Sequence, residues 1–145
     1  MKAQGSVEAL GLLGGLVIVL LAITIFLPQQ QSEIGLERNR AIALQSAQAI
    51  ATAADDVYLA GDGAQKSVSV EFPDGYDASR SYAGNKVDTG NIFNNRTIGI
   101  YVIGAGEITA ESRAPVCGTL PNASGEYRIT LYYNASGHVM VNASC

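Results

Sequence analysis

The sequence predicts an α+β protein: a long N-terminal helix, hydrophobic and then amphipathic, followed by a small C-terminal antiparallel β-sheet head. Three observations predict this class. Residues 9–27 form an apolar run without a charge. Residues 28–60 hold only one proline and one glycine and repeat small apolar side chains at helical spacing. From residue 64 onward apolar and polar side chains alternate, which is typical of half-buried strands.

The apolar run Ala9–Leu27 has 19 residues. As a helix it would measure about 28 Å, close to the hydrocarbon thickness of a bilayer. Glu8 stands at its leading edge, where an ionisable side chain is costly and commonly functional. Three interpretations compete: a cleaved secretory signal peptide, a plain membrane anchor, and a filament subunit whose helix lies first in a membrane and then in a helical bundle. Only the third gives Glu8 a role, as the partner of a positive charge on a neighbouring copy.

The residues around Glu8 resemble a known processing signal. The stretch Gln4–Leu12, which follows a short leader containing Lys2, reads Gln-Gly-Ser-Val-Glu-Ala-Leu-Gly-Leu. It resembles the class III signal peptide of archaeal type IV pilin precursors, Gln-x-Ser-x-Glu-x-x-x-Leu, at every fixed position. The bacterial pilin pattern would instead place the cut after Gly5, so the archaeal form fits better.

The resemblance implies a processing step and an architecture. A dedicated prepilin peptidase would cut between Ala3 and Gln4, which makes residues 1–3 the leader. The mature chain would then be a type IV pilin-like lollipop. Its parts would be an N-terminal helix over 4–60 (9–27 in the membrane or filament core, 28–60 amphipathic) and a β-rich glycosylated head over 64–145.

The second half of the expected helix carries one apolar stripe. Its members share helical spacing and are mostly small: Leu36, Ala43, Ala47, Ile50, Ala54 and Val57. Pro28 can kink the helix near its middle, and the glycines of Gly61–Gly63 end it. The stripe could pack on the sheet of the same chain or on neighbouring copies, and both interpretations remain open.

Period-two alternation predicts the strands of the head. They are expected at 68–72, 97–103, around 108–110, 126–133 and 138–143, with the last two joined by a hairpin at 134–137. Residues 73–95 are rich in Gly, Asp, Ser and Asn and predict a long connection with a short edge strand near residue 86.

Two further residue types indicate an exported protein. Cys117 and Cys145 predict a disulfide, because two cysteines in an oxidising compartment usually pair. Four Asn-x-Ser/Thr sequons predict N-glycosylation of an exposed surface; they stand at Asn95, Asn122, Asn134 and Asn142.

Composition and motifs argue against catalysis and nucleic-acid binding. The net charge of −4 and the pI of about 4.8 disfavour a nucleic-acid partner. His138, the only histidine, stands on an alternating strand without a neighbouring cysteine or acid. No phosphate loop, metal-spaced cluster or nucleophile motif occurs. We therefore expect no enzymatic activity, no catalytic residue, no cofactor and no metal; a calcium site among the loop aspartates has no spacing to support it.

These observations favour a structural subunit, a pilin, of an extracellular type IV pilus-like filament for surface adhesion or cell–cell contact. Cleavage would expose an amine at Gln4 to pair with Glu8 of a neighbour, and Gly11, Gly14 and Gly15 would let helices approach closely. The expected partners are other copies of the chain, the prepilin peptidase and assembly platform, and the membrane before assembly.

The expected location is the cell surface: a single-pass membrane protein with its head outside, and later an extracellular filament. Two alternatives remain, a membrane-anchored surface-binding protein that never polymerises and an archaellum-type filament subunit. The leader motif disfavours the first, because a plain anchor needs no cut before its span.

Overall fold

A computed structural model covers residues 1–145 and describes the chain except at residues 1–3, 85, 89–90, 94–95, 136 and 143–145. Side chains are likewise outside the description at 4–10, 26–32, 86–88 and 91–93. The chain divides into two units, Met1–Gly35 and Leu36–Cys145. We call the second the β-rich unit.

One helix, α1 (Gln4–Ala60), contributes to both units. It continues through Pro28. It ends where Gly61 adopts a φ of 87°, a left-handed conformation that glycine reaches without a Cβ clash. The Gly61 amide donates to Val57 O at 3.3 Å, and the Ala64 amide then donates to Gly61 O at 3.1 Å. This turn delivers the chain directly into the first strand.

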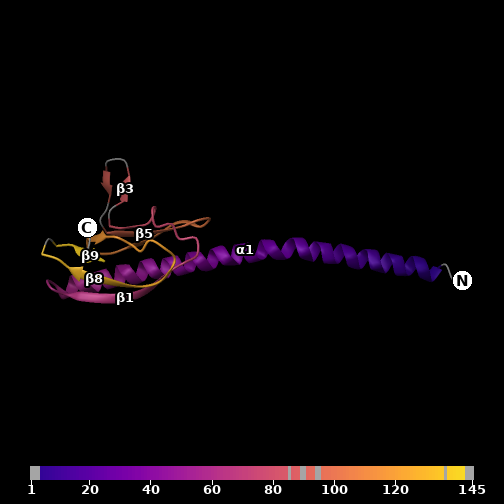
Figure 1. The fold of residues 1–145 in the computed structure, drawn as a ribbon, viewed down its shortest axis with the longest axis horizontal. Helices are drawn as coiled ribbons and strands as arrows, with labels where there is room; N and C mark the ends of the chain where they lie inside the picture. The colour runs from indigo at the N-terminus through magenta and orange to yellow at the C-terminus, as the bar shows by residue number, and fades with distance from the viewer. Residues whose placement is uncertain (1–3, 85, 89–90, 94–95, 136, 143–145) are drawn as a thin grey trace. The chain divides into compact units, whose positions relative to one another are not determined.

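A mixed seven-stranded sheet forms most of the β-rich unit (Figure 1). Its spatial order is β1-β8-β9-β7-β2-β5-β6. The strands are β1 (Gln65–Phe72), β2 (Tyr82–Ala83), β5 (Thr97–Val102), β6 (Gly106–Glu111), β7 (Val116–Gly118), β8 (Gly125–Tyr133) and β9 (Val139–Val141). A separate two-stranded sheet pairs β3 (Lys86–Asp88) with β4 (Asn91–Phe93).

The core lies between the sheet and residues 43–57 of α1. Alanines and Ile50 on that helical segment are buried together with the inward-facing residues of the strands. Eight strand residues in this core are 0% exposed: Ile98, Ile100, Val102, Val116, Ile129, Leu131, Val139 and Val141. Because alanine side chains are short, they let the sheet approach the helix closely. The stripe of small residues thus packs on the sheet of its own chain.

The predicted antiparallel head is wrong, because the sheet is mixed. β8 and β9 form the expected antiparallel hairpin, with Leu131 opposite Val141. The free edge of β9 then pairs with β7 in parallel, with Val116 opposite Val139. A three-residue strand has too little alternation to reveal itself, and its partner is set by packing.

The predicted long apolar membrane helix of the lollipop, and with it the single-pass membrane location with the head outside, is also corrected. Among residues whose side chains the structure describes, no helical stretch is long and apolar enough to cross a membrane. The described apolar stretch covers residues 11–25, whereas a span needs about 20 residues. The fold is therefore described as α1 with a mixed sheet.

Candidate functional site

The described apolar stretch of α1, residues 11–25, presents large side chains in every direction around the helix. Ten of them are between 47% and 77% exposed: Leu12, Leu13, Leu16, Val17, Ile18, Val19, Leu20, Leu21, Ile23 and Ile25. Thr24, the polar residue among them, donates its hydroxyl to Leu20 O at 2.7 Å. The stretch therefore has no polar face to turn toward water. We call it the apolar helical surface.

A shallow groove on this surface is lined by Gly11, Leu12, Gly15, Leu16 and Val19. Gly11 and Gly15 stand four residues apart and so share one side of the helix. A Cβ added at either glycine, or at Gly14, would have no neighbouring atom within 4 Å. The helix backbone is therefore accessible there, flanked by leucine and valine side chains.

The other residues of the predicted processing and assembly site are only partly described. Ala3 lies outside the described residues, and α1 begins at Gln4. Glu8 belongs to α1, but its side chain is outside the description. The pairing of Glu8 with a Gln4 amine stays a prediction from the sequence.

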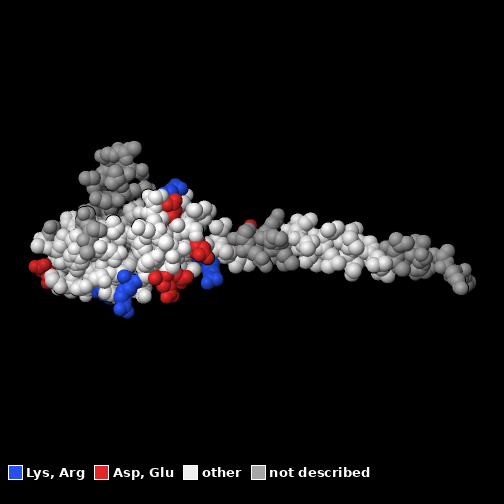
Figure 2. Space-filling model, in the orientation of Figure 1, with Lys and Arg blue, Asp and Glu red and all other residues white. Residues whose placement is uncertain are grey.

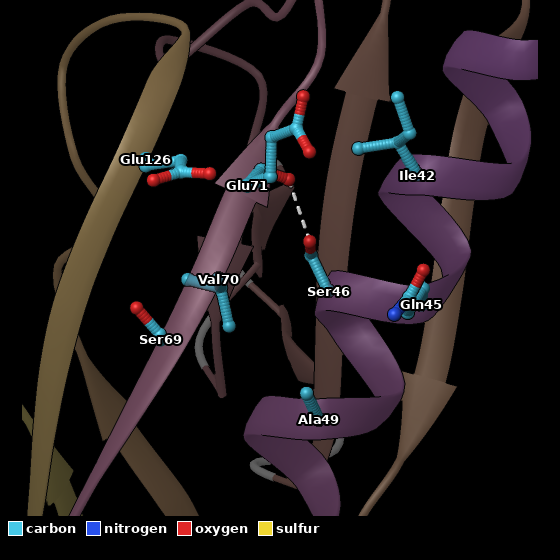
Figure 3. A pocket seen from close by; sticks show the side chains of 8 residues that line it. All are labelled: Ile42, Gln45, Ser46, Ala49, Ser69, Val70, Glu71 and Glu126. Carbon is cyan, nitrogen blue, oxygen red and sulfur yellow. Dashed lines mark hydrogen bonds between the residues drawn. The ribbon is translucent and has the colours of Figure 1, made fainter.

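A second groove, of about 240 Å³, lies between α1 and β1 (Figure 3). It is lined by Ile42, Gln45, Ser46, Ala49, Ser69, Val70, Glu71 and Glu126. Ser46 is 4% exposed and donates its hydroxyl to the backbone oxygen of Glu71 at 2.6 Å. This contact attaches the helix to the first strand of the sheet.

The Ser46 contact satisfies a group that the sheet leaves unpaired. The Tyr133 amide donates to Ala64 O, so every second residue from Ala64 onward bonds to β8. Glu71 falls at the intervening positions, whose backbone groups point away from β8. β1 is an edge strand, and Ser46 caps the last of these outward carbonyls.

The carboxylates of Glu71 and Glu126 are cross-strand neighbours at the rim of this groove. Both residues are exposed, so water screens their repulsion. Within the described part of the chain, no group of three or more His, Cys, Asp or Glu could hold a metal. Sequence reasoning missed this groove because its lining comes together only through the β1–β8 register.

Asp55 holds α1 to the opposite end of the sheet. Its Oδ1 accepts a hydrogen bond from Ser112 Oγ at 2.8 Å and from the Arg113 amide at 2.7 Å. The Ala114 amide adds a longer contact of 3.3 Å. The segment that receives the carboxylate connects β6 to β7. Helix α1 is thus joined to the sheet near both of its edges, through Ser46 and through Asp55.

Tyr76 packs in the loop after β1. Its ring lies 4.6 Å from that of Phe72, centroid to centroid, and its hydroxyl donates to Pro121 O at 2.9 Å. Burial raises the pKa of the Tyr76 hydroxyl from 10.0 to about 12. Nearby, hydrogen bonds from the Ser79 amide and hydroxyl to Oδ1 of Asp77 lower the pKa of the Asp77 carboxyl.

The sequon asparagines differ in their surroundings. Asn95 lies outside the described residues. Asn122 is exposed in the connection between β7 and β8, whereas the Asn134 and Asn142 side chains take part in hydrogen bonds. His138 directly precedes β9, is half-buried, and donates its amide to Asn134 Oδ1. It therefore belongs to the hairpin.

The expected Cys117–Cys145 disulfide is not part of the described structure. Cys117 lies in β7 and has no free thiol, but Cys145 lies outside the described residues. Cys117 is disulfide-bonded, and its pairing with Cys145 stays a prediction from the sequence.

Charges on the described residues are scattered. In Figure 2 basic and acidic side chains are interspersed over the visible face of the β-rich unit. One ion pair among them joins Lys66 to Asp56 at 2.5 Å, with both side chains about half exposed. Such a pair contributes little, about 0–1 kcal/mol. Comparison of the chain with protein-family models, with curated proteins and with solved structures gave no match.

Proposed function

We propose that the chain is a structural subunit, a pilin, of a type IV pilus-like filament that mediates adhesion or cell–cell contact. Its copies would assemble by packing their apolar helices after a short leader has been removed. The observation that carries this proposal is the apolar helical surface, whose first residues, Gly11 and Leu12, are also the last two of the Gln4–Leu12 processing motif.

The energetics favour burial of this surface against several copies. Its ten large side chains are about half exposed, so removing them from water contributes on the order of 10 kcal/mol. Association costs roughly 4–15 kcal/mol in lost translational and rotational freedom. One helix–helix contact would bury only part of the surface and would barely offset this cost. A filament, in which each helix has several neighbours, would bury it on all sides.

The glycines support the same proposal by geometry. Gly11 and Gly15 leave the backbone open on one side of the helix, with Leu12, Leu16 and Val19 beside it. Small residues four apart allow helices to approach closely and gain dispersion contacts along their length. The β-rich unit has its own core and would remain a separate module in the assembled filament.

The experiment combines processing with assembly. The full chain is expressed with and without a prepilin peptidase, and the product is examined by N-terminal sequencing and negative-stain electron microscopy. We expect a chain that begins at Gln4, retains residues 9–27, and forms filaments only after cleavage. A product that still begins at Met1, one cut beyond Leu27, or a processed chain that stays monomeric would contradict the proposal.

A further inference from the structure

Three sequons of the β-rich unit have described asparagines, and their side-chain amides are used differently. In N-glycosylation the amide nitrogen Nδ2 becomes bonded to the sugar, which is bulky and must lie at the surface. An asparagine whose amide holds a turn together must first leave that turn. Hydrogen bonding of the asparagine in the folded chain therefore separates available sequons from unavailable ones.

Asn122 is available. It lies in the connection between β7 and β8, and Asn122, Ala123 and Ser124 are all exposed. Among the hydrogen bonds of the described residues, none involves the side chain of Asn122 or Ser124. The neighbouring Pro121 is fixed from inside by the Tyr76 hydroxyl. The sequon therefore follows a residue that is held in place by a hydrogen bond, and its own asparagine and serine side chains make none of the described hydrogen bonds.

Asn134 and Asn142 contribute to the fold. Asn134 Oδ1 accepts the His138 amide at 3.1 Å and its Nδ2 contacts Met140 Sδ at 3.2 Å, which closes the β8–β9 hairpin. Asn142 adopts a φ of 54°, a left-handed conformation that asparagine tolerates better than most residues. Its side-chain Nδ2 donates to Thr119 O at 3.2 Å, and its backbone amide donates to Thr130 O at 3.0 Å.

We propose that, among the three sequons with described asparagines, Asn122 is the one at which the folded β-rich unit accepts an N-linked glycan, and that Asn134 and Asn142 serve the fold. The donor is a lipid-linked saccharide activated by a phosphate. Nδ2 of Asn122 forms a bond to the anomeric carbon, while the bond from that carbon to the phosphate oxygen breaks. The phosphate leaves with the electron pair, and a base of the transferase takes the amide proton. This inference is independent of filament assembly.

The experiment compares the folded chain with free peptides as acceptors. An oligosaccharyltransferase and its lipid-linked saccharide are incubated with the full folded chain, with the Asn122→Gln variant, and with the synthetic peptides 114–128 and 129–145. Trypsin cleaves after Arg113 and Arg128, so the first tryptic peptide contains Asn122 and the second contains both Asn134 and Asn142. Mass spectrometry of the two peptides then assigns the glycan.

We expect the folded chain to carry the glycan on 114–128 with at least tenfold preference over 129–145. Both free peptides should be modified, which would show that the second region is a competent acceptor once it is unfolded. Asn122→Gln should lose the glycan on 114–128 and keep the unfolding midpoint. Comparable glycan on 129–145 in the folded chain, or none on 114–128 while its free peptide is modified, would overturn the assignment.

Discussion

The carboxylate of Asp55 accepts a hydrogen bond from the hydroxyl of Ser112 at 2.8 Å and so joins the helix to the connection between β6 and β7. The same oxygen accepts two backbone amides of that connection. Ser112 is 5% exposed, so the contact is partly shielded from water. These contacts lie at the opposite edge of the sheet from Ser46, and they predict that one carboxylate holds a large share of the helix–sheet attachment.

Replacement of Asp55 with Ala should destabilise the β-rich unit by about 2–3 kcal/mol, because buried donors lose a charged acceptor. Urea unfolding followed by circular dichroism measures this. Asp56→Ala is the matched control, since its ion pair with Lys66 is half exposed and should cost less than about 1 kcal/mol. Equal midpoints for the two variants would refute the anchoring role of Asp55.

Gly63 and Gly84 have similar backbone conformations, so substitutions at the two positions distinguish backbone strain from steric clash with a neighbouring segment. Gly84 has a φ of 83°, and a Cβ there would lie 1.5 Å from Val116 O. Gly63 has a φ of 80° with no atom within 4 Å. We expect Gly63→Ala to lose about 1 kcal/mol from backbone strain alone. Gly84→Ala should disrupt the β2–β7 pairing and prevent stable folding, as judged by thermal unfolding. Similar losses in both variants would show that space at Gly84 is not limiting.

The raised pKa of Tyr76 predicts that the free energy of unfolding falls at alkaline pH. Below pH 10 its hydroxyl is protonated in both the folded and the unfolded chain. Between pH 10 and about 12 the unfolded chain loses the proton while the folded chain keeps it, so the free energy of unfolding falls as pH rises. Tyr76→Phe removes this titration. Urea unfolding from pH 8 to 12 should show a less stable variant at pH 8, without the hydrogen bond to Pro121, and a shallower decline above pH 10. Parallel curves would contradict the burial of this hydroxyl.

The glycines of the apolar helical surface predict an assembly defect without a folding defect. Gly15→Leu should raise helix propensity and still block close approach of a second helix. Filament counts by electron microscopy should fall at least tenfold. Gly35→Leu, on the same helix and with equally open surroundings, is the control. If Gly35→Leu reduced the count as strongly, the effect would belong to bulk on the helix in general.

Loss of the Glu8 charge should also impair filament assembly. A mature amine at Gln4, with a pKa of about 7.7–8.0, is largely protonated at neutral pH and would be left without a partner by Glu8→Gln. We expect few filaments with unchanged subunit levels on a whole-cell blot. Glu33→Gln serves as control because Glu33 is an exposed acid further along α1. Filament numbers and assembly rates equal to those of the parent chain would show that the pairing does not occur.

Period-two alternation located β1, β5, β6, β8 and β9 but missed β2 and β7. The runs at 68–72, 97–103 and 126–133 coincide with β1, β5 and β8. β7 and β2 are three and two residues long, too short for a periodic pattern, and they pair with strands distant in sequence. Their place depends on Gly84 and Gly118, whose missing side chains let backbones approach. A glycine in a sequence typical of a loop does not indicate that another backbone segment packs against it.

The contacts that position the helix on the sheet also could not be predicted from the sequence. Ser46 stands among alanines and reads as part of a small-residue stripe, yet its hydroxyl meets a strand carbonyl 25 residues away. Asp55 and Asp56 are the same residue type. Only the direction of each side chain makes Asp55 a contact with the connection between β6 and β7 and Asp56 a surface charge. Such roles depend on tertiary geometry that periodicity does not encode.

The attachment of residues 43–57 to the sheet makes the chain divisible at a defined place. Every described core residue lies at or beyond Ala43, and Ser46 and Asp55 supply polar contacts that join the helix to the β-rich unit. A recombinant fragment that begins at Leu36 would keep the whole core and discard the apolar helical surface. It should be monomeric and soluble at high concentration, whereas a fragment that begins at Asp56 would expose the inner face of the sheet and aggregate. The apolar helical surface could therefore vary in sequence without a change in the described core of the β-rich unit.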